Sequence, residues 1–201
     1  TRAVEVEPRN AAPHLLLARF YAQVGQAANA ESAARRGLEF APDDAALRLL
    51  LAGVLENRGA FGEAIEQYEL LYRAQPDSVI VANNLASLLA EFREDDPEAI
   101  AFAERVAQRL RASDIPQFKD TYGWIAFLRG DLDEALRTLE PAAEALPDNA
   151  LVRYHVGRVH AARGDVAAAR ENLEAALAID PAFPNAASAR DALDALPRQG
   201  G

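Results

Sequence analysis

Histidines are the residues of this chain best suited to binding a metal ion, and their spacing argues against that role. His155 and His160 are five positions apart, which turns their side chains about 140° away from each other on a helix. His14 lies far away along the chain. We expect His160 to face the core. The sequence therefore predicts no metal ligands.

Paired carboxylates are the second feature with catalytic potential, since two of them in a dry cleft can act as general acid and base. They occur at Asp43-Asp44, at Asp95-Asp96, and at Asp131 with Asp133-Glu134. Each group stands in an expected loop or first helical turn, where carboxylates accept hydrogen bonds from free N–H groups. No glycine-rich phosphate loop or nucleophile motif is present. We therefore expect no catalytic residues, no cofactor and no enzyme activity.

The composition favours an all-α protein. Half of the 201 residues are apolar, alanine and leucine dominate, and β-branched residues are sparse. The formal charge of −10 and the scattered positions of the 21 basic residues disfavour nucleic acid as a partner. No apolar run approaches the roughly 20 residues that cross a bilayer, so no membrane insertion is predicted. The absence of cysteine is compatible with both the cytoplasm and the periplasm.

A period of 34 residues organises the chain. It is marked by prolines, each followed by turn residues, at Pro8, Pro42, Pro76, Pro147 and Pro181. The step between neighbouring prolines is 34, except that the third and fourth are separated by two periods plus three residues. About midway between prolines, where a first helix must end and the chain must reverse, stand Gly25, Gly59, Gly130 and Gly164. Each period therefore predicts two helices joined by a tight turn.

Apolar columns recur with the same period. In each first helix a large residue precedes a small one, at Leu17-Ala18, Leu51-Ala52, Leu85-Ala86, Tyr122-Gly123 and Val156-Gly157. In each second helix a small residue recurs, at Ala30, Ala64, Ala99, Ala135 and Ala169. A large residue beside a small one lets two helix axes approach closely. The columns therefore predict helices that stack along the whole chain.

The helix-turn-helix period, the large-then-small pair, the alanine of the second helix and the closing proline together resemble the tetratricopeptide repeat. The resemblance covers nearly the whole chain and implies a right-handed α–α superhelix of about five repeats. The expected repeats are 11–44, 45–78, 79–115, 116–149 and 150–183. Residues 1–10 would be the tail of a truncated preceding repeat, 184–196 a capping helix and 197–201 a disordered tail. We therefore expect the chain to be a fragment of a longer bacterial protein.

Two places depart from the regular pattern. In the third repeat Arg93 replaces the turn glycine, and Asp96 and Pro97 follow as an expected N-cap and first helical residue. The same repeat carries three extra residues, two of them around Asp114-Ile115, which predicts a bend or loosened packing there. Pro141 is expected to interrupt the second helix of the fourth repeat.

The resemblance implies that the first helix of each repeat lines a concave groove. By helical phase, the candidate binding residues are Asn83, Asn84, Ser87, Asp120, Thr121, Trp124, Phe127, Tyr154, His155 and Arg158. The two asparagine amides would bind an extended backbone, the aromatic rings would contact apolar side chains, and Arg158 with Asp120 would set the charge register. Two alternatives stay open: Trp124 packs in the core, and Asn84 bonds to a neighbouring helix.

The predicted function is a non-enzymatic scaffold that binds a peptide or protein segment in this groove. One alternative is a self-assembling module, because Leu15, Leu16, Leu49 and Leu50 leave an apolar face for upstream repeats or for a second copy of the chain. Another alternative is the recognition arm of a larger bacterial envelope or exopolysaccharide-export protein.

Overall fold

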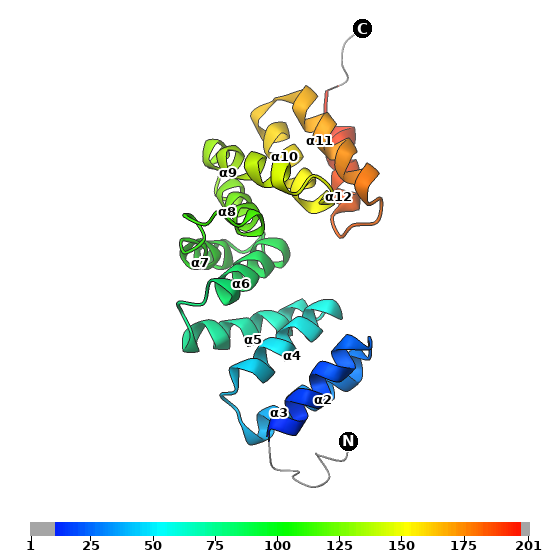
Figure 1. The fold of residues 1–201 in the computed structure, drawn as a ribbon. Helices are drawn as coiled ribbons and strands as arrows, with labels where there is room; N and C mark the ends of the chain where they lie inside the picture. The colour runs from blue at the N-terminus through cyan, green and yellow to red at the C-terminus, as the bar shows by residue number, and fades with distance from the viewer. Residues whose placement is uncertain (1–10, 198–201) are drawn as a thin grey trace. The chain divides into compact units, whose positions relative to one another are not determined.

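The computed structural model describes residues 11–197, and every regular element in that range is an α-helix (Figure 1). The helices are α2 (Ala11–Gln23), α3 (Ala27–Phe40), α4 (Ala45–Asn57), α5 (Phe61–Ala74), α6 (Val79–Phe92), α7 (Pro97–Ala107), α8 (Pro116–Leu128), α9 (Leu132–Ala145), α10 (Ala150–Arg163), α11 (Val166–Ile179) and α12 (Ala186–Ala195). The all-α prediction is confirmed. The expectations for residues 1–10 and for the tail 198–201 lie outside the described residues.

The chain divides into two compact units, residues 1–88 and residues 89–201, which we call the first and second unit. In the first unit α2 packs on α3, and α4 packs on α5, on α3 and on α2. The second unit repeats this arrangement: α8 packs on α7 and α9, and α10 packs on α11, α9 and α8. The short α12 lies against α11 and α10. Two helices therefore fall within each expected repeat, and α12 lies within the expected cap.

Local signals in the sequence begin and end these helices as predicted. The Asp44 carboxylate accepts hydrogen bonds of 2.9 Å from the N–H groups of the first turn of α4. Asp96 caps α7 in the same way, with Pro97 as the first helical residue. Gly164 ends α10 with a φ of 82°, and the other three turn glycines are also left-handed.

The large-then-small pairs allow close helix contact. A methyl group added to Gly123 would lie 2.7 Å from Leu139 Cγ, and one added to Gly157 would lie 2.8 Å from Leu173 Cγ. Each glycine therefore lets the leucine of its own repeat's second helix pack directly onto the first helix. The prediction of close approach at these positions is confirmed.

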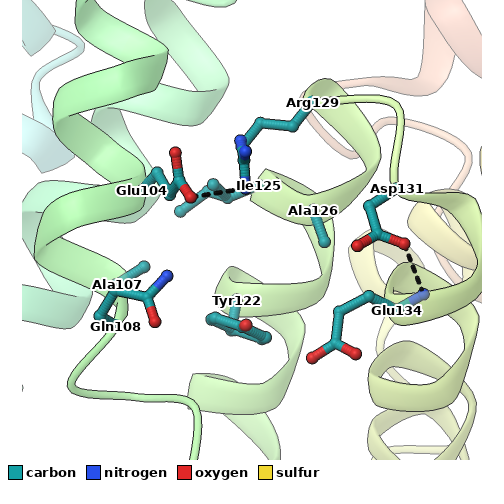
Figure 2. Close-up of a pocket in the computed structure, with 9 residues that line it drawn as sticks. All are labelled: Glu104, Ala107, Gln108, Tyr122, Ile125, Ala126, Arg129, Asp131 and Glu134. Atoms are coloured by element: carbon teal, nitrogen blue, oxygen red, sulfur yellow. Dashed lines mark hydrogen bonds and ion pairs between the residues drawn. The ribbon is translucent and has the colours of Figure 1, made fainter.

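The third repeat is irregular because it contains three extra residues. α7 begins 18 residues after the start of α6, whereas the second helix of every other repeat begins 16 residues after the first, so two of the extra residues precede α7. The third lies between the start of α7 and the start of α8 at Pro116. A pocket of about 30 Å³ lies beside the connection from α7 to α8, between α7, α8 and α9, with Gln108 and Tyr122 among its lining residues (Figure 2). Its volume is that of about one water molecule. Whether the packing of this repeat is looser than that of the others stays a prediction.

The prediction that Pro141 interrupts its helix is wrong. α9 continues from Leu132 to Ala145 with Pro141 inside it. Pro141 is exposed, so a helix carbonyl that loses its N–H donor there can bond to water instead.

Candidate functional site

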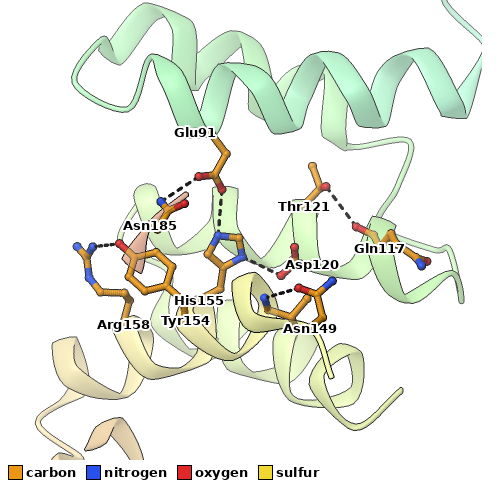
Figure 3. A network of polar contacts seen from close by, with 10 residues as sticks. Glu91, Gln117, Asp120, Thr121, Asn149, Tyr154, His155, Arg158 and Asn185 are labelled. Atoms are coloured by element: carbon orange, nitrogen blue, oxygen red, sulfur yellow. Dashed lines mark hydrogen bonds and ion pairs between the residues drawn. The ribbon is translucent and has the colours of Figure 1, made fainter. Parts of the chain in front are cut away.

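A charged side-chain cluster joins three helices of the second unit (Figure 3). His155 on α10 lies between two carboxylates, with Nδ1 2.8 Å from Asp120 Oδ1 and Nε2 3.0 Å from Glu91 Oε1. Asp120 belongs to α8, and Glu91 belongs to the last turn of α6. The His155 ring is 2% exposed. We call these three residues the histidine cluster.

The carboxylates determine the protonation state of His155. Burial alone lowers the pKa of an imidazole, but the charges and hydrogen bonds of Asp120 and Glu91 outweigh burial and raise the pKa of His155 to about 9. The ring is therefore an imidazolium at neutral pH, and both of its N–H groups donate to carboxylate oxygens. The cluster thus holds the buried imidazolium between two largely buried carboxylates.

One further polar contact extends the histidine cluster, and Thr121, next to Asp120, bonds within its own helix. Asn185, which precedes α12, donates from Nδ2 to Glu91 Oε2 across 3.3 Å. Thr121 donates from Oγ1 to the Gln117 carbonyl oxygen of its own helix across 3.2 Å. The Asn185 contact ties the cap of the chain to α6, a connection between residues 94 positions apart.

Aromatic rings pack on the histidine cluster. Trp124 stacks on His155 with ring centroids 4.2 Å apart, and on Phe127 at 4.8 Å. Tyr154 lies 6.0 Å from Trp124 and 5.8 Å from Phe183, which belongs to the connection between α11 and α12. Tyr154 is 2% exposed. These rings form a continuous packed layer between α8, α10 and the connection before α12.

The expectation that Trp124 is exposed in a groove is therefore wrong. Trp124 is 2% exposed, which is the core packing weighed as its alternative, and its indole N–H has no partner in the structure. Asp120, Thr121 and His155 are also buried. Trp124 and Asp120 are covered by His155 of the next repeat, and His155 lies between Asp120 and Glu91. Whether any of them contributes to binding stays a prediction.

Arg158 lies at the edge of the aromatic layer. Its guanidinium carbon is 6.0 Å from the centroid of Trp124, 5.8 Å from that of Phe127 and 5.5 Å from that of Tyr154. One N–H group donates to Tyr154 Oη across 2.5 Å. Within residues 11–197 Arg158 forms no ion pair. Arg158 and Phe127 are both partly exposed, and we call them the arginine–phenylalanine surface.

The asparagine pair lies in the first unit and forms a separate network. Asn84 donates from Nδ2 to Tyr68 Oη across 3.1 Å, and that hydroxyl lies 3.3 Å from Glu56 Oε2. Burial first, and then the nearby carboxylate, raises the pKa of Tyr68 to about 12. Asn83 donates to Asn84 Oδ1 across 3.3 Å, while its own Oδ1 is buried without a partner. Asn84 therefore bonds to a neighbouring helix, which was its alternative.

Two residues named in the sequence-based predictions remain, Ser87 and His160. Ser87 is partly exposed on α6. His160 is not a core residue, because its ring is partly exposed and lies 3.4 Å from Asp165 and 3.6 Å from Glu140. In the described part of the chain no group of three or more His, Cys, Asp or Glu side chains is arranged so that it could hold a metal ion.

Two segments of the chain match family models described as the tetratricopeptide repeat, at residues 15–79 and 126–193. The solved structure of YrrB, a protein of this kind, matches 95% of the chain and 97% of its own length with a TM-score of 0.69 and 22% identity. The chain belongs to the tetratricopeptide-repeat family. The resemblance predicted from the sequence is confirmed.

Other solved tetratricopeptide-repeat structures share the fold. A thermophilic protein of this kind from Thermus thermophilus, TTC0263, matches 91% of the chain and 98% of its own length, with a TM-score of 0.63 and 21% identity. PilW, a type IV pilus biogenesis factor, matches 92% and 89% with a TM-score of 0.67 and 14% identity. YrrB is described as having an unusual peptide-binding site. At these identities the likeness concerns the fold alone.

A curated relative is much longer than this tetratricopeptide-repeat chain. Cellulose synthase operon protein C of Pseudomonas fluorescens (strain SBW25) is 24% identical over 170 residues, which is 82% of the chain. The chain spans 13% of that protein's length.

Tetratricopeptide-repeat proteins are generally non-catalytic scaffolds, and the fold suggests a protein–protein interaction scaffold with protein or peptide partners. None of the helices between residues 11 and 197 combines the length and hydropathy needed to cross a bilayer.

Proposed function

We propose that the second unit binds a segment of a partner protein at the arginine–phenylalanine surface. In this proposal Arg158 donates hydrogen bonds to an oxygen of the partner, either a backbone carbonyl or a carboxylate, and Phe127 contacts an apolar side chain. Beneath these two residues lies a layer of buried side chains, which we call the floor and which consists of Trp124, Tyr154, His155, Asp120 and Thr121. The observation that carries the proposal concerns the guanidinium of Arg158. It forms no ion pair with a described residue, and it lies against three aromatic rings and donates to one of them, Tyr154.

The chemistry of Arg158 suits such a role. A guanidinium has five N–H donors, and the described contacts of Arg158 use one of them, on Tyr154 Oη. The rings of Trp124, Phe127 and Tyr154 hold the cation electrostatically without occupying its remaining donors. Arginine, tryptophan and tyrosine are enriched among the residues that contribute most to protein–protein binding.

The histidine cluster supports the proposal because it holds the side chains of this floor in one arrangement. Trp124 stacks on the same His155 ring that both carboxylates hold. A binding surface whose supporting side chains are already ordered loses less conformational entropy when a partner binds. We therefore assign the histidine cluster a positioning role rather than direct contact with the partner.

Asn83, Asn84 and Ser87 remain proposed binding residues of a separate surface in the first unit. Asn83 is the better candidate of the two asparagines, because Asn84 already donates to Tyr68 Oη of a neighbouring helix, whereas the described side-chain contact of Asn83 is with Asn84 alone. Asn84 would contribute by orienting Asn83 through its own Oδ1.

The test begins with peptides selected from a random display library on the complete chain. Hydrogen exchange of the chain with a selected peptide should show protection of α8 and α10, which carry Phe127 and Arg158. The Arg158→Ala variant should lose this protection, whereas Arg170→Ala on α11 should keep it. Protection confined to other helices, or protection that survives Arg158→Ala, would refute the proposed surface. A loss of affinity with added salt would identify a carboxylate rather than a carbonyl as the acceptor.

We further propose that the chain serves as one recognition segment within a larger bacterial protein involved in export across the envelope. The likeness to cellulose synthase operon protein C, of which the chain spans 13%, supports this proposal. Deleting these residues from the intact parent protein should abolish export of its product while the protein still accumulates. Normal export after the deletion would exclude this role.

A further inference from the structure

A hollow beside α8 and α9 is basic, although the chain carries a net charge of −10. Its volume is about 320 Å³, and it is lined by Arg111, Lys119, Glu134, Arg137 and Thr138. Three of these side chains are cations and one is a carboxylate, which leaves two positive charges in excess. Lys119 is the only lysine of the sequence, beside 20 arginines. We call this pocket the lysine hollow.

Three different segments of the second unit bring the cations together. Arg111 belongs to the connection between α7 and α8, Lys119 to α8 and Arg137 to α9. That connection, 108–115, is eight residues long, whereas the connections 41–44, 75–78 and 146–149 have four residues each. Arg111 therefore stands on a segment without a counterpart in the regular repeats.

The repeat period supplies an internal reference for Lys119. The corresponding residues are Arg48 of α4 and Arg153 of α10. Each of these arginines donates to an amide oxygen on the second helix of its own repeat. Arg48 Nη1 lies 2.9 Å from Gln67 Oε1, and Arg153 Nη1 lies 3.3 Å from Asn172 Oδ1. In these two repeats the cation is thus held by a neighbouring amide.

The fourth repeat has Thr138 at the position of that amide. The hydroxyl of Thr138 donates to the Glu134 carbonyl oxygen across 2.7 Å. The described ion pair of Lys119 is with Asp114 at 3.4 Å, and the Asp114 side chain is fully exposed to water. A pair with so exposed a partner contributes little. The Lys119 ammonium, which has three donors, is therefore free to bind an anion.

Arg137 reverses the charge that other repeats carry at the same place. Its counterparts are Glu66 in α5 and Glu171 in α11. The fifth repeat has a similar hollow of about 380 Å³, in which the charges of Arg153 and Glu171 cancel. The hollow is thus common to the two repeats, whereas its positive charge belongs to the fourth repeat.

Glu134 pairs with both arginines of the lysine hollow. Its Oε2 pairs with Arg137 Nη2, and its Oε1 lies 3.9 Å from Arg111 Nε. These contacts use one N–H group of each guanidinium, and a guanidinium has five. One carboxylate cannot neutralise two guanidiniums and an ammonium. The arrangement therefore favours a further anion beside Glu134.

We propose that the lysine hollow binds a phosphate group, to whose oxygens Arg111, Lys119 and Arg137 donate. A phosphate ester carries between one and two negative charges near neutral pH and three acceptor oxygens, so it suits cations that come from three segments. A carboxylate has two oxygens, which a single arginine can bind in a bidentate manner. The lysine hollow shares no residue with the arginine–phenylalanine surface, so the two proposals are independent.

The single lysine makes phosphate binding directly measurable. Acetylation of amines by N-hydroxysuccinimidyl acetate, followed by mass spectrometry, reports one lysine side chain, that of Lys119. Inorganic phosphate and phenyl phosphate should each slow the acetylation of Lys119 in the complete chain, while free N-acetyl-lysine in the same solution reacts at an unchanged rate. Calorimetry gives the two affinities. Tighter binding of phenyl phosphate would identify a phosphate ester as the ligand, and equal binding would identify the free ion.

Three variants connect the binding to the lysine hollow. Lys119→Gln removes the ammonium, and Arg137→Glu gives the fourth repeat the charge of its counterparts. Each should weaken phosphate binding in calorimetry at least about tenfold. Arg153→Gln is the matched control, because it removes a cation from the similar hollow of the fifth repeat, and it should bind phosphate as the parent does. The unfolding temperature of Lys119→Gln should stay close to that of the parent, because its described partner Asp114 is exposed.

The proposal is overturned if neither soluble phosphate protects Lys119 at about 10 mM. It is also overturned if Lys119→Gln and Arg137→Glu bind phosphate as the parent does, or if Arg153→Gln weakens binding as much as they do. Lower unfolding temperatures of the first two variants with unchanged affinity would assign the cations a structural role. Binding to phosphatidylcholine vesicles that contain phosphatidic acid, without binding of either soluble phosphate, would assign them to a membrane surface and would likewise contradict the proposal.

Discussion

His155 Nδ1 lies 2.8 Å from Asp120 Oδ1, and this contact joins the first helices of two consecutive repeats. The two residues are 35 positions apart, one more than the repeat period. A stacking repeat thus places a histidine of one helix beside a carboxylate of the previous one. Trp124 packs on the same ring, so the contact links the charges of the second unit to its aromatic layer.

The stability of the second unit should fall as the pH rises through about 9. The pKa of His155 is about 9 in the folded chain and about 6.5 in an unfolded one. A raised folded-state pKa stabilises the fold fully below about pH 6.5, and this contribution is lost as the pH passes 9. Its size is on the order of 3 kcal/mol. Urea unfolding between pH 6 and pH 10 measures it.

His155→Gln and His160→Gln form a matched pair for this measurement. The first variant should remove the loss of stability between pH 6.5 and pH 9, and the second should keep it, because the contacts of His160 are longer and its ring is partly exposed. An unchanged pH dependence in His155→Gln would show that other groups cause it.

Gly157→Ala should destabilise the chain by about 1–2 kcal/mol, although alanine has the higher helix propensity. The added methyl group would lie 2.8 Å from Leu173 Cγ and 3.1 Å from the Leu173 backbone nitrogen. Gly53→Ala is the control, since a methyl group there meets no atom within 4 Å, and it should stabilise the chain by up to about 1 kcal/mol. Equal effects of the two variants in thermal unfolding would contradict the close helix approach at Gly157.

Trp124→Ala should lower the free energy of unfolding by about 3–5 kcal/mol, the usual effect of truncating a buried aromatic residue. Denaturant unfolding followed by circular dichroism measures the change. A loss below about 1 kcal/mol would contradict the burial of Trp124.

The sequence predicts the structural features that are determined by residues adjacent along the chain. Gly164 is left-handed and Asp96 caps its helix because these roles follow from local backbone chemistry. The burial of Trp124 and Tyr154 could not be predicted in this way. Phe183 contacts Tyr154 because the connection before α12 folds back on α10, and no periodic pattern specifies that path.

Only some of the polar contacts of the site could be predicted from the sequence. Asp120 and His155 both appear among the predicted binding residues, since helical phase places each on the expected groove face of its helix. Their pairing becomes visible once the first helices are stacked. Asn185 lies 94 residues from Glu91, and no motif in the sequence connects the two.

The affinity of the complete chain for a selected peptide, measured by calorimetry on matched arginine variants, tests the proposed surface most directly. Arg158→Ala should weaken binding at least tenfold, about 1.4 kcal/mol, while its unfolding temperature stays close to that of the parent. Arg170→Ala should bind as the parent does. Equal affinity of Arg158→Ala and the parent for every selected peptide would contradict binding at the arginine–phenylalanine surface.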